Sequence, residues 1–473
     1  MRPSVGQLPR RLSTGRRFAL ATLTCGVASI GCGGGAATLD DAGGGDRAGE
    51  GGGCPLGEPQ RTLPAGGIRA ATTLYARCSP YYLAGPLMVT APLTIEAGVK
   101  VETCSASCDS RLTITGFNGR LTAIGSAEAP IVFSPRVPGE GRPGEWTGLM
   151  IRDTLGGSAL EHVIIEYAGG ATTGRPEFGD DRLVNAGLVL WDTPGVSIKN
   201  TTFRHNRHYG LRVKYRDADN DMQVLRAFTG NTFQGNTTAA MRWPVNQLGA
   251  IGVGNCFAGR DPSNGACRAL PIAADARAEG ALVEGEQGES RAQFVTRNAT
   301  WRALDVPYRL LDGVIIEDAA LEIAEPNEIW VDIGSITVGL NSPGSLKAVA
   351  KAPNGIRFRS AKEVPAAGDW DGILFEERAS GAGSALENVE VAHGGRASWR
   401  AGEGKAGIWI YNAGPVIKNA YVHHTNGGAI HWNCHSSAIV ENPTFDNVQC
   451  KPEARQNWGC PCTPFVACKP TCQ

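Results

Sequence analysis

The octapeptides GEWTGLMI (Gly144–Ile151) and GDWDGILF (Gly368–Phe375) are two versions of one sequence, and they decide the fold. Around them the chain matches itself at an offset that drifts from about 228 to about 218 residues, as insertions in surface loops would cause. Other matching segments keep the same order along the chain: Thr73–Tyr81 with Thr300–Tyr308, Ser158–Val163 with Ser384–Val389, and Ala186–Leu190 with Ala406–Ile410. The sequence therefore predicts one architecture used twice in tandem.

Short runs with apolar residues at positions i and i+2 recur throughout both copies, at intervals of roughly ten to twenty-five residues. Leu149–Ile151 and Ile408–Ile410 are examples, and turns rich in Gly, Asn, Asp and Pro separate them. A period of two places the outer residues of each triplet on the inner face of a strand. The two-residue hairpin turns that an antiparallel meander needs are scarce. We therefore predict an all-β fold in which parallel coils stack as a solenoid.

Asparagines recur beside these triplets, at Asn200, Asn231, Asn388 and Asn419. In stacked coils such a side chain would hydrogen-bond the turn of the next coil and form a ladder. The alternative is a set of ordinary, isolated turn asparagines.

The N-terminal region has the features of an export signal. Basic residues precede an apolar run, Phe18 to Ile30, which is too short for a comfortable membrane span. Ser29-Ile30-Gly31-Cys32 resembles a bacterial lipobox, although Ser29 stands where Leu is usual, and an ordinary cleavage site is the alternative. We predict a lipoprotein of the cell envelope that is anchored to the outer membrane by a diacylglyceryl group on Cys32. The sequence does not distinguish the periplasmic face of that membrane from the surface face.

These features divide the chain into five parts. They are a signal peptide (1–31), a flexible Gly-rich tether (32–53), a first solenoid copy with a connecting segment (54–295), a second copy (296–450) and a Cys-rich tail (451–473).

The fourteen cysteines indicate an oxidising compartment. Removing Cys25 with the signal peptide and Cys32 by lipidation leaves an even number. Spacing favours disulfides Cys54 with Cys78, Cys104 with Cys108, Cys256 with Cys267 and Cys434 with Cys450, and a tail (Cys460, Cys462, Cys468, Cys472) that closes on itself. A zinc site in the tail is the alternative, but the tail lacks the paired two-residue spacing of structural zinc sites.

Charge gives no sign of a polyanionic partner. The chain holds 45 basic and 46 acidic residues, and its first 32 residues contribute five Arg and no acid. The exported part is therefore slightly acidic, which argues against nucleic acid.

The phrases LTAIGSAEAPIVF (Leu121–Phe133), GEWTGLMI and LEHVIIEYAGG (Leu160–Gly170) resemble the right-handed parallel β-helix lipoproteins of Gram-negative bacteria, within the pectin-lyase-like superfamily. The resemblance covers roughly residues 70–450 and implies the handedness of the solenoid. It says little about function, since this fold hosts lyases, hydrolases, adhesins and scaffolds without catalysis. Enzymes of this superfamily need carboxylate clusters on consecutive coils. The nearest candidate, Asp180-Asp181, has no equivalent in the second copy.

Two groups of residues are candidates for binding a metal ion. Asp217, Asp219 and Asp221 have the spacing of a calcium loop, but Met222 and Phe228 stand where Gly and Glu are required, so a solvated acidic turn is the alternative. We expect the adjacent His423 and His424 to point to opposite faces of a strand, which would prevent both from binding one ion. Calcium is the one cofactor left open.

The second copy also carries a set of aromatic and polar residues that we expect to face outward: Trp409, Tyr411, Tyr421, His423 and Trp432. Aromatic faces stacked along a solenoid would suit pyranose rings, although single exposed aromatics are common. We expect a non-enzymatic scaffold or binding protein for surface glycan or another envelope protein. The alternative is a polysaccharide lyase or glycoside hydrolase of the pectin-lyase-like superfamily.

Overall fold

The computed structural model describes residues 54, 61–104, 109–136, 141–170, 185–214, 223–268, 283–286, 294–397, 405–433 and 435–448. All of them belong to one compact unit, Gly53–Gln473. The predicted signal peptide, lipidation site Cys32, tether and Cys-rich tail lie outside the described residues. Within the described part of the chain, no helix is long and apolar enough to cross a membrane.

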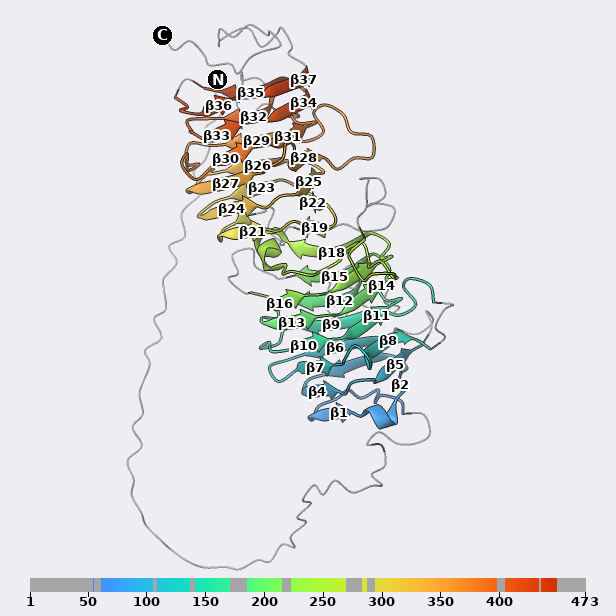
Figure 1. The fold of residues 1–473 in the computed structure, drawn as a ribbon. Coiled ribbons are helices and arrows are strands. Elements are labelled where there is room, and N and C mark those ends of the chain that lie inside the picture. Colours follow the sequence, from blue (N-terminus) through green and yellow to red (C-terminus); the bar gives the residue numbers. More distant parts are fainter. Residues whose placement is uncertain are drawn as a thin grey trace, which may run out of the picture. The chain divides into compact units, whose positions relative to one another are not determined.

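The strands stack in parallel sheets, here named A, B, C, E and F (Figure 1). Sheet C contains β1 (Thr72–Leu74), β4 (Pro92–Ile95), β7 (Arg120–Ile124), β10 (Ala159–Glu161), β13 (Val196–Lys199) and β16 (Leu225–Thr229). Sheet A contains β2 (Tyr81–Leu83), β5 (Lys100–Thr103), β8 (Ile131–Pro135), β11 (Val163–Glu166), β14 (Thr202–Arg204) and β17 (Thr232–Gln234).

Sheet B begins with β3 (Pro86–Val89), β6 (Arg111–Thr115), β9 (Gly148–Arg152), β12 (Ala186–Trp191), β15 (Tyr209–Lys214) and β18 (Ala239–Pro244). It continues through β19 (Val283–Glu286), β22 (Tyr308–Leu310), β25 (Asn327–Val331), β28 (Ile356–Ser360), β31 (Val389–Ala392), β34 (Tyr421–Thr425) and β37 (Thr444–Val448). Sheet E contains β20 (Phe294–Val295), β23 (Val314–Ile316), β26 (Ser335–Val338), β29 (Gly372–Phe375), β32 (Ala406–Ile410) and β35 (Gly428–Trp432). Sheet F contains β21 (Ala299–Trp301), β24 (Ala319–Ile323), β27 (Gly344–Val349), β30 (Ala385–Glu387), β33 (Val416–Lys418) and β36 (Ile439–Glu441).

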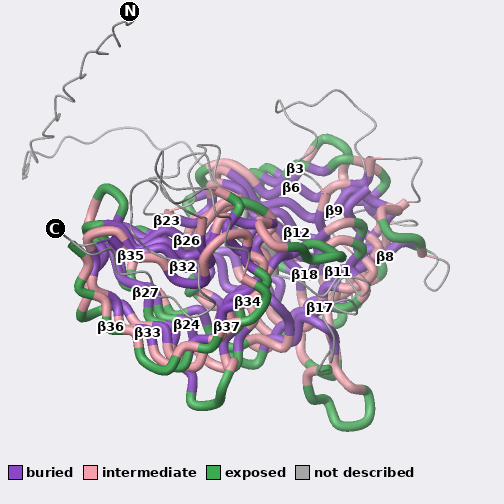
Figure 2. The backbone as a smooth tube through the Cα atoms, turned by 90° about the horizontal axis from the view of Figure 1, so that it is seen from above, coloured by how far each residue is buried: buried purple, intermediate pink, exposed green. Residues whose placement is uncertain are grey.

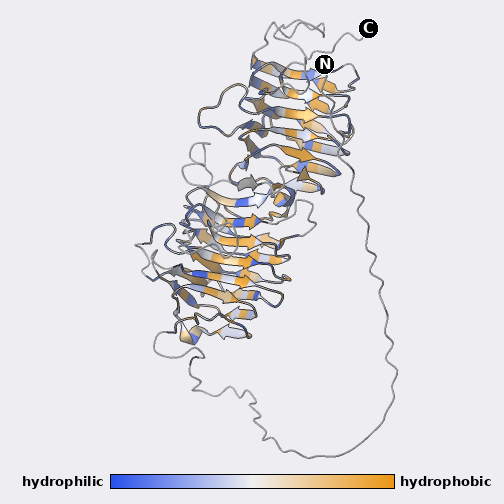
Figure 3. Ribbon diagram, turned by 180° about the vertical axis from the view of Figure 1, so that it is seen from behind, coloured by the Kyte–Doolittle hydropathy of each residue, from blue (hydrophilic) through white to orange (hydrophobic). Residues whose placement is uncertain are grey.

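Within each copy a strand pairs with the strand three positions further along the chain, as β6, β9 and β12 do, so three strands make one coil. Identical inward positions therefore stack, for example Leu112, Leu149 and Leu188. The outer residues of the triplets are buried in one continuous core that runs through both copies (Figures 2 and 3). The prediction of an all-β parallel solenoid is confirmed.

The duplication appears element by element, since β1–β17 correspond in order to β21–β37. Trp146 and Trp370 occupy equivalent buried positions, and their indole N–H groups donate to the equivalent carbonyls of Glu166 (2.8 Å) and Ala392 (2.7 Å). The sheets do not correspond in the same way. β9 in sheet B is equivalent to β29 in sheet E, and β8 in sheet A is equivalent to β28 in sheet B. Equivalent faces of the two copies thus belong to different sheets.

Among the described strands, only those of sheet B continue across the junction between the copies, through β18, β19 and β22. The 3-10 helix η3 (Val245–Ala250) contacts strands of both copies there. Asp305 of the second copy accepts backbone hydrogen bonds from Phe257 (2.9 and 3.1 Å) and Ala258 (3.1 Å) of the first. Burial raises the pKa of the Asp305 carboxyl despite these bonds. This carboxyl therefore holds the end of the first copy against the start of the second.

Two predicted disulfides are confirmed. Cys54–Cys78 joins the start of the described chain to the short 3-10 helix η1 (Ala76–Cys78), and Cys256–Cys267 closes a loop after η3. Cys104 is also disulfide-bonded, whereas its expected partner Cys108 lies outside the described residues. So do the remaining predicted cysteines: Cys434, Cys450, Cys460, Cys462, Cys468 and Cys472.

Candidate functional site

Several corners of the solenoid are single residues in the left-handed backbone conformation. The corner between sheets C and A uses His162 and Asn200 in the first copy. Its equivalent between sheets F and B uses Asn388, Asn419 and Asn442. Asparagine tolerates this conformation better than most residues, which explains its recurrence. Asn419 Nδ2 donates to Asn388 Oδ1 (3.1 Å), so the predicted ladder forms there.

A second ladder lies inside the first copy. Asn231 Nδ2 donates to Asn255 Oδ1 (3.0 Å), and Asn206 Nδ2 donates to Asn236 Oδ1 (3.0 Å). Asn200, in contrast, contacts His162 (3.5 Å) rather than another asparagine. The sequence reasoning identified Asn231 but missed Asn206 and Asn236, which follow the next corner.

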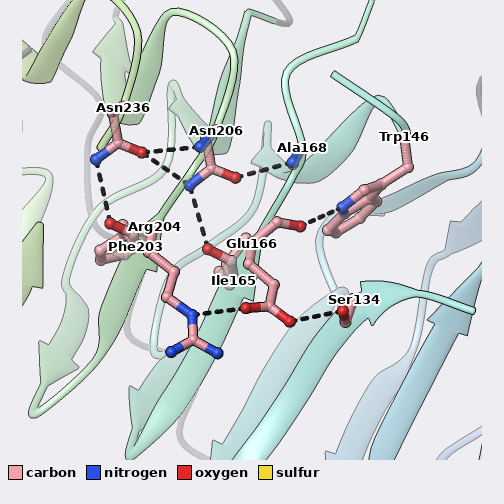
Figure 4. Close-up of polar contacts among 9 residues, drawn as sticks. All are labelled: Ser134, Trp146, Ile165, Glu166, Ala168, Phe203, Arg204, Asn206 and Asn236. Atoms are coloured by element: carbon pink, nitrogen blue, oxygen red, sulfur yellow. Dashed lines mark hydrogen bonds and ion pairs between the residues drawn. The ribbon is translucent and has the colours of Figure 1, made fainter. Parts of the chain in front are cut away.

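Figure 4 shows the polar network at that next corner, between sheets A and B of the first copy. Glu166 is 5% exposed and accepts hydrogen bonds from Ser134 Oγ (2.6 Å) and Arg204 Nε (2.6 Å). Asn206 receives the backbone N–H of Ala168 (2.9 Å) and donates to the carbonyl of Ile165 (3.1 Å). Each of these buried groups is satisfied within the fold, so this corner is structural.

The equivalent corner of the second copy has different chemistry. Arg204 is replaced by His423, His205 by His424 and Tyr167 by His393, while Ala392 stands where Glu166 was. His393 and His424 keep the left-handed conformation of the residues they replace. The ion pair of the first copy is thus absent at this corner, and a group of histidines takes its place.

A series of hydrogen-bonded side chains runs across β31, β34 and β37 and consists of Glu390, His423, His424 and Asn447. His423 Nε2 lies 3.3 Å from Glu390 Oε1, His423 Nδ1 lies 2.6 Å from His424 Nδ1, and His424 Nε2 lies 3.2 Å from Asn447 Nδ2. The amide of Asn447 must donate, so His424 carries its proton on Nδ1 and donates to His423. His423 then donates from Nε2 to the carboxylate. This arrangement of protons gives every member a hydrogen-bond partner.

The contact between His423 and His424 corrects the expectation that they face opposite sides of the strand. His424 has a φ of 50°, which turns the chain so that both rings lie on the outer side of sheet B. Strand alternation holds only for extended residues, and His424 is not one. Within the described residues, no group of three His, Cys, Asp or Glu side chains could hold a metal ion.

Charge and burial shift the pKa values of Glu390 and His393 at this corner. Burial would raise the pKa of Glu390, but the hydrogen bond from His423 and the positive charges of Arg357 and Arg359 outweigh it, so the pKa is lowered. Burial and the neighbouring His423 and His424 lower the pKa of His393 to about 4. The Nδ1 atom of His393 is buried without a hydrogen-bond partner. The corner therefore holds a neutral imidazole beside an ionised carboxylate at neutral pH.

Tyr421 and His423 form a pair of stacked, partly buried rings on the outer side of β34. Their rings are stacked, with centroids 4.4 Å apart and planes 23° apart. Inward-facing Val422 between them is fully buried, so the two rings stand on the solvent side of the sheet. Arg357 Nε lies 3.6 Å from Glu390 Oε2 beside them. We call Arg357, Glu390, Tyr421, His423, His424 and Asn447 the β34 patch.

The predicted aromatic strip does not form as one surface. Trp409 is 1% exposed and packs with Leu374 and Ala406 in a small cluster on the outer side of sheet E, with Tyr411 at its edge. Trp432 pairs in register with Ile410 and packs against the main core, so it points inward. Ile408 and Ile410 point inward as predicted, but the outer face of β32 is buried as well. Tyr411, Tyr421 and His423 are partly exposed, and of these Tyr421 and His423 stack on each other.

The acidic candidate residues of the first copy lie in two segments that are outside the described residues. Asp217, Asp219 and Asp221 of the calcium loop, and Asp180 and Asp181 of the carboxylate cluster, lie outside the described residues.

Sequence reasoning missed Glu390 and His393. The duplication itself carried the signal, because Glu390 replaces the apolar Ile164 and His393 replaces Tyr167 within an otherwise matching segment. Comparisons with protein-family models, with curated proteins and with solved structures give no significant match.

Proposed function

We propose that the chain is a lipid-anchored protein of the bacterial cell envelope that acts as a non-enzymatic scaffold and binds glycan through the β34 patch. In this proposal Cys32 carries the lipid at the start of the tether (32–53), and the solenoid winds as a right-handed β-helix followed by a Cys-rich tail. The basic and apolar N-terminal stretch and the lipobox-like Ser29–Cys32 support the anchor. The disulfides Cys54–Cys78 and Cys256–Cys267 support an oxidising compartment.

One observation carries the binding proposal: the stacked rings of Tyr421 and His423 lie beside hydrogen-bonding groups on the solvent side of a continuous sheet. Sugar rings present an apolar C–H face that packs on aromatic rings, and their hydroxyls pair with carboxylates, guanidinium groups and amides. Glu390, Arg357 and Asn447 supply those three kinds of group.

The first copy provides an internal comparison. At the equivalent positions it has Thr202 for Tyr421, Arg204 for His423, and Ile164 for Glu390. Arg204 is occupied there by its ion pair with the buried Glu166. The fold therefore does not require the aromatic surface, and its presence in one copy alone is what a binding role would produce.

A glycan-array measurement on the purified chain tests the proposal. We expect selective binding that falls about ten-fold on Tyr421→Ala, because the loss of one aromatic stacking contact removes roughly that much affinity. Thr202→Ala, the same change at the equivalent strand of the first copy, should leave binding unchanged. Equal binding by both variants would place the ligand elsewhere. Release of reducing or unsaturated ends by the chain would favour the lyase or hydrolase alternative.

A further inference from the structure

The two ends of the solenoid differ in how their apolar interior is covered. At the N-terminal end, residues 61–70 cross the first coil, and their Leu63 and Ile68 are 5% and 4% exposed. The backbone of this segment pairs with the free edges of β2 and β3: the amide of Leu63 donates to Tyr82 O (2.9 Å) and that of Ile68 to Met88 O (2.8 Å). The disulfide Cys54–Cys78 ties the chain down beside it.

The C-terminal end has no such cover among residues 405–433 and 435–448. β35, β36 and β37 are the last strands of sheets E, F and B. Val440 and Phe445 pair in register with Ile417 and Val422, which are fully buried, but are themselves only partly buried. Ile439 is 50% exposed. An open stack of strands with apolar side chains at its edge invites association or aggregation.

We propose that the Cys-rich tail, residues 451–473, covers this end of the solenoid. The chain leaves β37 at Val448, on the coil that needs covering, and the tail contains the apolar Trp458, Phe465 and Val466. Six cysteines lie between residue 434 and the C-terminus, so a small segment without a core of its own can be held by disulfides, as Cys54–Cys78 holds the opposite end.

Charge agrees with this occupant. Glu441 and Asp446 on the last coil are exposed acidic residues. The tail carries Lys451, Arg455 and Lys469 against one acid, Glu453. Opposite charges therefore face each other when the tail lies across β36 and β37. A second copy of the chain would bring the same acidic residues together.

Hydrogen exchange of the oxidised full chain, read by mass spectrometry, tests the cap. The amides of residues 439–448 should be protected about as well as those of residues 72–83 at the covered end. Phe465→Ser with Val466→Ser should speed exchange at 439–448 at least ten-fold and leave 72–83 unchanged. Phe117→Ser, at a residue that is 79% exposed, is the matched control and should change neither segment.

Rapid exchange at 439–448 in the unaltered chain would overturn the proposal, and so would an unchanged rate in the double variant. Light scattering identifies the competing occupant. Protection that appears only at concentrations where the chain is dimeric would assign this end to a second copy and reject the tail.

Discussion

Trp409 packs against His431 of the next coil on the outer side of sheet E, with ring centroids 4.3 Å apart and ring planes tilted by 34°. Both side chains would be exposed if strand alternation alone decided burial. Instead Trp409 is 1% exposed and packs with Leu374 of the preceding coil. The second copy therefore buries both faces of β32.

The first prediction follows from that burial. Trp409→Ala should lower the free energy of unfolding by about 3 to 5 kcal/mol, the range for removing a buried large aromatic side chain. Leu155→Ala, at a residue that is 70% exposed, should lower it by well under 1 kcal/mol. Denaturant titration of both variants measures the difference. An equally small loss for Trp409→Ala would show that Trp409 is exposed rather than buried.

The second prediction concerns pH. Burial lowers the pKa of His431 to about 4, whereas an unfolded histidine titrates near 6.5. Between these values the unfolded chain binds more protons, so stability falls as pH drops from about 6.5 to about 4. His431→Gln should reduce this loss by an amount on the order of 2 kcal/mol. Identical pH profiles for His431→Gln and the unaltered chain would contradict the assignment.

The third prediction concerns the asparagine ladder of the first copy. Asn206→Ala leaves the backbone N–H of Ala168 and the carbonyl of Ile165 without the bonds they now make in the interior. Each unsatisfied buried group costs about 1 to 3 kcal/mol, so the variant should unfold at clearly lower denaturant. Asn264→Ala removes an exposed turn bond (2.9 Å) and serves as the control. Similar midpoints for the two variants would show that the ladder contributes nothing.

The fourth prediction concerns the junction between the copies. Asp305→Ala removes the acceptor of the Phe257 and Ala258 amides. We expect these two amides to exchange at least ten-fold faster, while amides in β4 and β33, remote from the junction, keep their rates. Uniformly faster exchange would instead mean that the variant destabilises the whole solenoid.

The fifth prediction tests the anchor. Cys32→Ala should abolish fatty-acid labelling and partitioning into detergent, because two acyl chains supply the membrane affinity. Cys25→Ala, within the apolar run of the signal, should preserve both. Persistent labelling of the Cys32→Ala protein would place the lipid elsewhere.

Much of the fold could be predicted because it depends on a repeating local pattern. The i and i+2 spacing of residues such as Leu149 and Ile151 placed the core correctly, and the scarcity of hairpin turns indicated parallel coils. The pairs Cys54–Cys78 and Cys256–Cys267 followed from spacing because each closes a short segment.

The surface was harder to predict because a period of two separates inside from outside but does not show whether the outside is covered. For this reason the prediction that Trp409 points outward is correct, but the prediction that it is exposed is wrong. The predicted direction of the His424 side chain is wrong because His424 itself is left-handed and interrupts the alternation of the strand. Glu390 and His423 come together from neighbouring coils, and the register that aligns them depends on loop lengths that the sequence does not constrain.

The change of sheet at the junction also limits how the protein can engage an extended partner. Equivalent residues of the two copies, such as Thr202 in sheet A and Tyr421 in sheet B, stand on different sides of the molecule. Gene duplication often yields bivalent binding, in which two like sites contact one flat target and gain avidity. Here a planar target that contacts one member of an equivalent pair misses the other. The proposed binding through the β34 patch is therefore expected to be monovalent.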